Sequence, residues 1–377
     1  MVRKTIFVYD DSLSRHTLSD THPMKPERLR YTYELLDSYN AFAPENSLLV
    51  PPRSATEEEI LQFHSRDYLE EVKKLSSGDL FSPSPQFNFG SGDNPPYSGM
   101  YEASTRSTGA SMTAVEALLS NEADAAFSIS GGLHHAMPGY TYGFCIFNDP
   151  VIAIQRLVQE GLKVAYVDID CHHGDGVQHA FYDTDAVLTI SMHESGKFLF
   201  PGTGFPEEIG EGKGRGYAVN VPLYPYTSDD VYLWAFKEIV EPLVERFRPD
   251  VLVTQLGIDS HFLDPITHMA LTTQGHNAVV AACADMGIPK WLALGGGGYD
   301  LQAVARAWTL DYAVMSGQVF ADEIPHAYQS SFQVETLRDQ KELPIQDTVV
   351  NDTRKFAEES VKAVQSLIFP THGISTV

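Results

Sequence analysis

The chain has 377 residues, of which 43% are hydrophobic and 20% are charged, so it can bury the core of a sizeable soluble protein. Its formal net charge of −24 argues against nucleic acid and anionic membrane as direct partners, because binding phosphate groups needs a basic face. The acidic balance is compatible with a cationic or lysine-bearing substrate, although most excess acid in such a chain is solvated surface.

The cysteines and the N-terminus indicate the cellular compartment in which the protein is expected. Cys145, Cys171 and Cys283 have no CxxC spacing, so no disulfide framework is expected and a reducing compartment is favoured. The N-terminal apolar run is too short for a signal peptide, and no stretch reaches the roughly 20 apolar residues that a membrane helix needs. We therefore expect a cytoplasmic protein, and its oligomeric state stays open.

Short apolar, β-branched runs alternate with longer helical segments, which is typical of a parallel sheet with helices on both faces. We expect strands at Thr5–Tyr9, Ala125–Ile129, Val164–Asp168, Val187–Met192, Val251–Leu256 and Trp291–Leu294. We expect helices at Pro26–Tyr39, Ala110–Leu119, Pro150–Glu160, Asp229–Phe247 and Thr272–Met286. Because we find no internal boundary, residues 1–377 are predicted to form a single α/β domain.

Three segments depart from this alternation. Ser76–Tyr101 is rich in Ser, Pro, Gly and Asn and is expected to be a long surface loop, which in a compact domain is often functional. The pattern weakens after Leu310, and Glu323–Val350 is expected to be irregular. A final helix, Asp352–Leu367, is predicted to pack back on the sheet.

The most informative motif is Asp168-Ile169-Asp170-Cys171-His172-His173-Gly174-Asp175-Gly176, which directly follows a predicted buried strand. Open α/β sheets place their ligand sites at the carboxyl ends of their strands. In an extended segment alternate residues share a face, so Asp170 and His172 can point into one pocket. This Asp-x-His pair has the spacing and the atoms for a divalent metal.

Four other predicted strands also end in polar or glycine-rich clusters, and at one edge of one sheet these clusters would meet in a single crevice. The clusters are Ser130-Gly131-Gly132-Leu133-His134-His135, His193, Gly257-Ile258-Asp259-Ser260-His261 and Gly295-Gly296-Gly297-Gly298-Tyr299.

A catalytic zinc commonly has three protein ligands and one open position for water. Asp259 is our candidate for the third ligand beside Asp170 and His172, and a helix N-cap is its alternative role. Two carboxylates and one imidazole are rich in oxygen, so Fe(II), Mn(II) or Co(II) would also fit.

A metal that activates water also needs a base for the proton and an acid for the leaving amine. His134 and His135 suit these tasks, and Asp168 and Asp175 lie at plausible reach to set their tautomers. The alternative for the histidine pair is an ordinary turn or core packing.

The residues 295–298 lack the Lys-Ser/Thr of a P-loop and are not a GxGxxG fingerprint. A flexible glycine run would instead let Tyr299 approach the metal as a hydroxyl donor to a developing oxyanion, or Tyr299 is a buried structural residue. Phe144 and Phe200 either wall a narrow apolar channel or cover the core.

These clusters, in this order, resemble the zinc-dependent histone deacetylase superfamily, most closely its class I-like branch and the bacterial acetoin-utilization deacetylases. The resemblance covers most of the chain. It runs from His22-Pro23-Met24-Lys25-Pro26-Glu27-Arg28 through Phe63-His64-Ser65, Gly143-Phe144-Cys145-Ile146-Phe147-Asn148-Asp149 and Phe200-Pro201-Gly202-Thr203-Gly204 to Ala305-Arg306-Ala307-Trp308.

The resemblance implies an arginase-like fold with an eight-stranded parallel sheet, and hydrolysis of N-ε-acyl-lysine to lysine and a carboxylate. By position it implies zinc ligands at Asp170, His172 and Asp259, an acid–base pair at His134 and His135 oriented by Asp168 and Asp175, and a carbonyl-polarising Tyr299.

The resemblance also implies substrate-binding and potassium-binding residues. Phe144 and Phe200 match the tunnel walls, Gly143 a carbonyl that meets the substrate amide, Asp93 a rim aspartate, Arg28 the arginine of an internal channel, and Ile266 lies in a loop that sets the channel width. A first potassium ion would be held by Asp168, Asp170, His172, Ser191 and Met192, and a second by Phe181, Thr184, Val187 and Tyr217.

The chain departs from eukaryotic class I enzymes in Ser260–His268, which is similar to the acetoin-utilization type, and in Met137-Pro138 after the histidine pair. These departures argue against histone specificity and leave the hydrolytic chemistry untouched. Our leading hypothesis is a metal-dependent lysine deacylase acting on a protein or peptide. The alternatives are an acetylpolyamine amidohydrolase and a catalytically silent acyl-lysine binding module.

Overall fold

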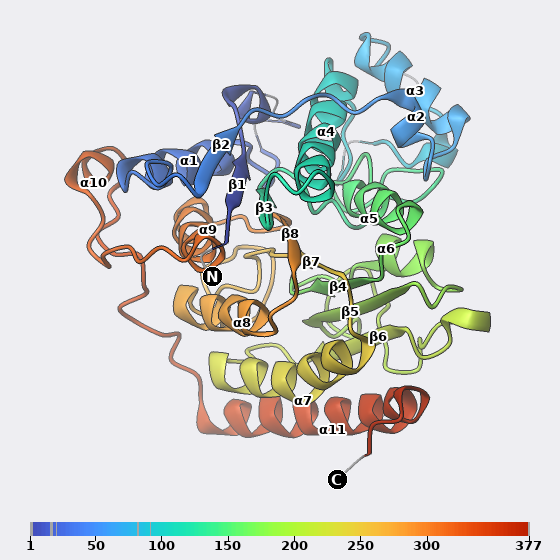
Figure 1. Cartoon of the computed structure of the whole chain (residues 1–377), viewed down its shortest axis with the longest axis vertical. Coiled ribbons are helices and arrows are strands. Elements are labelled where there is room, and N and C mark those ends of the chain that lie inside the picture. The colour runs from blue at the N-terminus through green and yellow to red at the C-terminus, as the bar shows by residue number, and fades with distance from the viewer. Residues whose placement is uncertain (1–2, 16–17, 20, 81–82, 91, 376–377) are drawn as a thin grey trace.

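In a computed structural model of the protein, eight strands form one sheet in which every neighbouring pair is parallel (Figure 1). The structure describes residues 3–15, 18–19, 21–80, 83–90 and 92–375. The strands are β1 (Thr5–Val8), β2 (Ser47–Val50), β3 (Ala125–Ser128), β4 (Val164–Asp168), β5 (Val187–Glu194), β6 (Ala218–Leu223), β7 (Val251–Gln255) and β8 (Lys290–Leu294). They lie in the order β2-β1-β3-β8-β7-β4-β5-β6, so the predicted eight-stranded parallel α/β fold is confirmed.

Helices cover both faces of the sheet, because successive strand residues point to opposite faces and both sets are apolar. In β1, Phe7 belongs to one buried cluster, whereas Ile6 and Val8 belong to another. The Phe7 cluster includes residues of α1 (Glu27–Ser38), α7 (Asp229–Phe247), α8 (Thr273–Asp285) and α9 (Leu301–Ser316). The Ile6 cluster includes residues of α4 (Met100–Leu119) and α5 (Asp149–Gln159).

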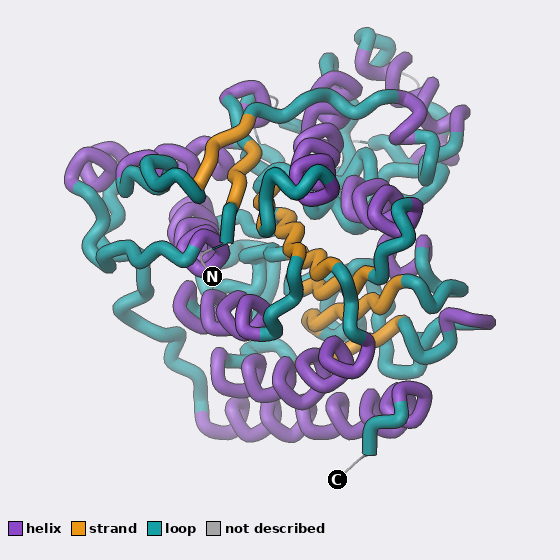
Figure 2. Tube along the Cα trace, viewed as in Figure 1, coloured by secondary structure: helices purple, strands orange, loops and turns teal. Residues whose placement is uncertain are grey.

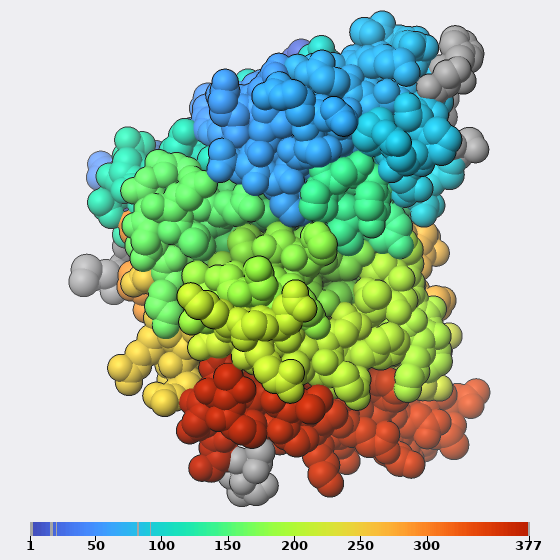
Figure 3. All heavy atoms as spheres, turned by 90° about the vertical axis from the view of Figure 1, so that its right-hand side faces the viewer, coloured from blue at the N-terminus to red at the C-terminus, as the bar shows by residue number. Residues whose placement is uncertain are grey.

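The remaining helices are α2 (Glu57–Ile60), α3 (Arg66–Ser76), α6 (Asp175–Ala180), α10 (His326–Phe332) and α11 (Asp347–His372), with 3-10 helices at Asp11–Ser14, Pro85–Phe87 and Gly212–Gly214. Of these, α11 contributes to the Phe7 cluster, and α6 contributes Val177 to the Ile6 cluster. The long α11 lies along α7 (Figure 1), and its atoms form the red layer at the bottom of the space-filling view (Figure 3). It also packs against the edge strand β6, where the Ser360 hydroxyl donates to the Pro222 carbonyl at 2.7 Å. The expected packing of a final helix against the sheet is thus confirmed.

Several boundaries differ from the sequence prediction. The strands β2 and β6 were not predicted, because β2 exposes Leu48 and Leu49 and β6 contains Asn220 and Pro222, which disguise a strand. The helix α4 begins ten residues earlier than expected, through a stretch rich in Ser and Thr. The segment expected to be irregular contains α10 and the beginning of α11, and α9 continues past Leu310.

Since all strands are parallel, the loops after β3, β4, β7 and β8 leave the sheet at the same end, where the carboxyl ends of the strands lie. Most of the polar clusters identified in the sequence lie in these loops, at the carboxyl ends of the strands. Figure 2 shows the strands, in orange, crossing the middle of the molecule between helices. In the described part of the chain, no helix combines the length and the apolar character needed to cross a membrane.

Candidate metal centre and active site

Three buried side chains from two adjacent strands form a group that could hold a metal ion. Asp170 and His172 follow β4, and Asp259 follows its neighbour β7. One ligand atom of each residue lies within 4.8 Å of the others. The alternative role of Asp259 as a helix N-cap is wrong, because the next helix begins only at Thr273, with Thr272 as its cap.

The surroundings of this group fit a divalent cation. The Nδ1 atom of His172 lies 2.8 Å from Oδ2 of Asp259 and 3.2 Å from Oδ1 of Asp170. Burial lowers the pKa of His172, but hydrogen bonds and charge from both carboxylates outweigh it and raise this pKa well above its ordinary value. The two carboxylates therefore favour a positive charge between them, which a metal ion would supply when bound.

Neighbouring groups that donate hydrogen bonds to the two carboxylates orient these candidate ligands, as is usual for metal sites. Oδ2 of Asp170 accepts from the backbone N–H of Gly297 at 2.8 Å and from Nε2 of Gln255 at 2.7 Å. Oδ1 of Asp259 accepts from the backbone N–H of Cys171 at 2.7 Å. A Cβ at Gly297 would overlap both carboxylates, so only glycine admits this approach. Gln255 was not predicted, although a polar residue ending a buried strand is a usable signal.

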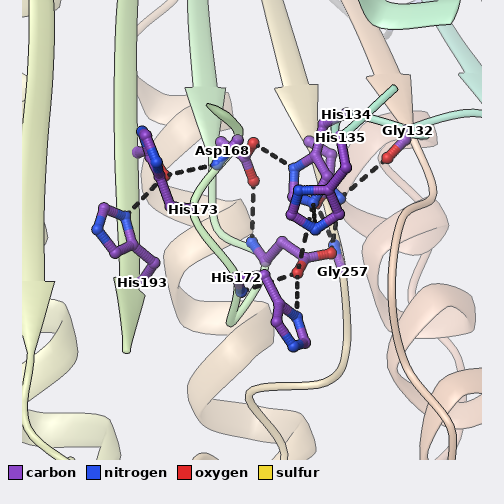
Figure 4. A network of polar contacts seen from close by, with 12 residues as sticks. Gly132, His134, His135, Asp168, His172, His173, His193 and Gly257 are labelled. Carbon is purple, nitrogen blue, oxygen red and sulfur yellow. Dashed lines mark hydrogen bonds and ion pairs between the residues drawn. The ribbon is translucent and has the colours of Figure 1, made fainter. Parts of the chain in front are cut away.

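The two histidines after β3 lie side by side (Figure 4). Each of them lies beside its own carboxylate. Nδ1 of His134 lies 2.7 Å from Oδ2 of Asp168, and Nδ1 of His135 lies 2.7 Å from Oδ1 of Asp175. Because both Nδ1 atoms face carboxylates, both Nε2 atoms are left to face each other, at 3.0 Å. That contact is a hydrogen bond only if one of the two Nε2 atoms carries a proton.

Their surroundings push the two pKa values apart. Burial lowers the pKa of His134, but the charges of Asp168 and Asp170 outweigh it and raise that pKa to about 9. Burial and the positive charge of His134 lower the pKa of His135 to about 4. Near neutral pH the metal-free pair therefore has a charged His134 and a neutral His135, which is the separation that acid–base chemistry uses.

Two neighbouring polar residues, which the sequence analysis placed in a motif of the resemblance without giving them a role, shape the turn bearing these histidines. The Asp149 carboxylate accepts from the backbone N–H groups of Gly132 at 3.1 Å and Leu133 at 3.0 Å. Nδ2 of Asn148 donates to the His134 carbonyl at 3.0 Å, and the same side chain caps α5. Their signal was an Asn-Asp pair at the start of a buried helix.

A cavity of about 420 Å³ opens onto this centre. Of the residues expected from the sequence, its wall contains Asp93, His135, Gly143, Phe144, His172, Phe200, Ile266 and Tyr299. Phe200 packs edge-on against the His135 ring at 5.2 Å, and Phe144 against the Tyr299 ring at 5.7 Å. The two phenylalanines thus line a passage to the centre instead of merely covering the core.

Tyr299 stands in the cavity wall as a hydroxyl donor. Its hydroxyl makes no hydrogen bond to any residue that the structure describes, and it remains available to a bound molecule. Burial, then the charges of Asp259 and Asp170, raise the pKa of Tyr299 well above its ordinary value, so the hydroxyl keeps its proton.

Arg28 and Asp93 occupy different places. Asp93 lies in the cavity wall, and its carbonyl lies 3.1 Å from Nε2 of His22. Arg28 does not line this cavity. It lines a second cavity of about 110 Å³ that also contains Phe144, and its Nη1 donates to the Gly298 carbonyl at 3.1 Å.

His193 is not brought into the crevice, contrary to the expectation from its strand end. Its ring packs against His173, and in Figure 4 both lie on the other side of Asp168 from the histidine pair. Its Nδ1 lies 2.8 Å from the Ser191 hydroxyl, and its Nε2 lies 2.9 Å from the Gly204 carbonyl. The residue supports a loop beside the site.

The candidate potassium ligands lie on β4, β5 and neighbouring turns. Asp168 and Ser191 are register partners, and Met192 follows Ser191 along β5. In the second set, Phe181 and Thr184 follow α6, Val187 begins β5, and the Tyr217 carbonyl accepts from the Thr189 backbone N–H at 2.9 Å. Potassium binding stays a prediction.

Comparison with known proteins shows which family has this fold and this arrangement of residues. Residues 22–315 match the histone deacetylase domain, and the chain belongs to this family. It is 39% identical to the acetoin utilization protein AcuC of Bacillus subtilis over 335 residues, covering 86% of this chain and 85% of that protein. It is 38% identical to human histone deacetylase 1 over 327 residues, covering 86% of this chain and 67% of that protein.

Solved structures agree with this assignment. The crystal structure of an HDAC homolog from Aquifex aeolicus superposes with a TM-score of 0.84 at 32% identity, covering 94% of this chain and 100% of that one. An HDAC homolog complexed with SAHA gives a TM-score of 0.83 at 32% identity, covering 94% and 99%. The resemblance drawn from the motifs is confirmed, including its acetoin-utilization branch.

Proposed function

We propose that the protein is a metal-dependent amidohydrolase that removes acyl groups, such as acetyl, from N-ε-acyl-lysine in a protein or peptide. The observation that carries this proposal is the cavity in which Phe144, Phe200 and Tyr299 stand beside His135 and the candidate ligand His172. An aromatic passage suits the four-methylene stem of an acyl-lysine, and the polar end suits its amide.

Zn²⁺ is the ion we propose for Asp170, His172 and Asp259, with Fe²⁺ as an alternative. When bound there, such an ion would lower the pKa of water toward neutrality and polarise the amide carbonyl.

The chain's own residues supply the rest of the proposed chemistry. Neutral His135, oriented by Asp175, lines the cavity, so its Nε2 takes the proton of the attacking water and returns it to the leaving amine. Charged His134, held by Asp168, stabilises the negative charge that develops during the reaction. The Tyr299 hydroxyl donates to the oxygen on which charge develops.

Further assignments extend this proposal. Asp93 and the Gly143 carbonyl would accept hydrogen bonds from the substrate, and potassium ions would support β4 and β5 at the two predicted sites. We propose that the whole chain works as one catalytic domain, because α11 packs on α7 and β6. The free, buried cysteines and the bacterial relatives support a cytoplasmic location.

The test is acetate release from an acetyl-lysine peptide by metal-stripped protein, before and after addition of one equivalent of Zn²⁺. Activity that appears only with metal supports the proposal. Acetylspermidine is assayed in parallel, because the net charge of −24 would also suit a cationic polyamine. A preference for the polyamine of more than about tenfold, some 1.4 kcal/mol in transition-state binding, would replace the lysine substrate. Hydroxamate binding without turnover of either compound would favour the binding module.

A further inference from the structure

A buried carboxyl group outside the metal group joins two parts of the cavity wall. Asp264 lies in the loop between β7 and α8. Its Oδ2 accepts from the backbone N–H of Tyr299 at 2.9 Å, and its Oδ1 accepts from the backbone N–H of Ile266 at 3.0 Å. Both of these partners line the cavity, whereas Asp264 does not.

Tyr299 has few other means of holding its place. It follows four glycines, and Gly296 and Gly298 adopt φ angles of +113° and +122°, a region that only glycine enters readily. Among the described residues, Asp264 is the sole acceptor of the Tyr299 backbone N–H, and the hydroxyl has no partner. A hydroxyl that must meet a carbonyl to within a fraction of an ångström needs such a backbone anchor.

We infer that Asp264 is a positioning residue for the reaction. Its carboxyl group fixes the backbone of Tyr299, and hence the hydroxyl, relative to Ile266 in the wall of the channel. This inference rests on the proposed function. The bond to Ile266 closes a local turn within the loop, of the kind that Asp and Asn form alike. The bond to Tyr299 spans 35 residues and joins two separate loops.

Asp264→Asn separates these two bonds. An asparagine has one carbonyl oxygen, which would keep the local turn to Ile266. Its NH₂ group would then face the Tyr299 backbone N–H, donor against donor, and the anchor would be lost. The matched control is Asp229→Asn, since Asp229 is also a partly buried carboxylate that accepts from a backbone N–H, that of Thr272 at 2.9 Å, without touching Tyr299.

The expected result is a fall in kcat of roughly 10- to 100-fold for Asp264→Asn, since one oxyanion donor is worth about 10² to 10³. KM and metal content should stay within about twofold, because the turn at Ile266 persists. In a Tyr299→Phe background the same substitution should cost less than about threefold, since residues that act through one group are not additive. Equal costs in both backgrounds would overturn the inference.

A second readout needs neither metal nor activity. Hydrogen–deuterium exchange of the peptide over residues 295–301 should be faster in metal-free Asp264→Asn than in the wild type, and unchanged in Asp229→Asn. Unchanged exchange in Asp264→Asn would overturn the inference even if the wild type proved inactive, so the two proposals fail separately. If Asp264→Asn does not fold, Asp264→Glu, which shifts the carboxyl group by one methylene, takes its place, with the same expected fall in kcat and the same faster exchange over residues 295–301.

Discussion

Nδ1 of His172 lies 2.8 Å from Oδ2 of Asp259, although 87 residues separate them in the chain. The two residues meet because β4 and β7 are parallel neighbours, so their carboxyl ends lie side by side at the same end of the sheet. Both are buried, so without a cation their charges must satisfy each other. This relationship makes the metal group directly testable.

Asp259→Asn should release the metal, because an amide oxygen is a far weaker ligand than a carboxylate and carries no charge. We expect Zn²⁺ content after dialysis, measured by elemental analysis, to fall well below one ion per chain. Asp300→Asn is the control, since Asp300 only caps α9. Full occupancy in Asp259→Asn would remove Asp259 from the ligand set.

His135→Ala should lower turnover by about 10² or more, as expected when a general acid–base group is lost. Metal content should not change, because His135 is not among the candidate ligands. Steady-state kinetics and elemental analysis on the same sample provide the measurement, with the exposed His326 replaced by Ala as the control. A variant with wild-type turnover would show that the base is another group.

Tyr299→Phe should reduce kcat by about 10² and leave KM nearly unchanged, because the hydroxyl is proposed to meet the carbonyl only as charge develops. The ring contact with Phe144 would persist in the variant. Kinetics on an acetyl-lysine peptide provide the test. Unaltered kcat would mean that Tyr299 serves the structure alone.

Stability should fall as pH decreases from about 6.5, because His64 is buried in its neutral form. Nε2 of His64 accepts from the Asn148 backbone N–H at 2.9 Å, and burial lowers the pKa of His64 to about 3. Between these two pH values the unfolded chain binds a proton that the folded chain does not, so the free energy of unfolding rises with pH.

Replacing His64 by Gln removes the group that takes up this proton in the unfolded chain. The slope of unfolding free energy against pH, from urea titrations between about pH 4 and 6, should flatten by up to about 1.4 kcal/mol per pH unit. His326→Ala should keep the wild-type slope. An equally steep slope in His64→Gln would mean that other groups cause the acid sensitivity.

Asp339→Ala should destabilise the fold by about 3–5 kcal/mol, because it leaves the buried Arg306 guanidinium without its carboxylate and the His261 ring without its hydrogen-bond partner. Asp339 lies 2.8 Å from Nη1 of Arg306 and 2.7 Å from Nε2 of His261. Asp322→Ala is the control, since its pair with Arg338 is exposed and worth at most about 1 kcal/mol. Urea unfolding midpoints compare the two, and equal losses would contradict the prediction.

Much of the fold could be predicted because the apolar runs of β1, β3, β4, β5, β7 and β8 are short and are separated by helical segments. The two strands that were missed lie at the edges of the sheet, and neither has a continuous apolar pattern, because β2 exposes Leu48 and Leu49 and β6 contains Asn220 and Pro222. The first half of α4 was missed because Ser, Thr and Gly are poor helix formers, and burial outweighs this preference there.

The sequence by itself determined which side chains stand at the strand ends, since a buried strand followed by Asp, His or Gly carries its own signal. It therefore indicated Asp170, His172, Asp259, His135 and Tyr299 before any contact was known. Only the tertiary structure decided that β4 lies between β7 and β5, and that Gln255, Asp264 and Asp339 hold the site loops. The physical reason is that hydrogen bonds between distant segments depend on strand order and loop geometry, which leave no local pattern in the chain.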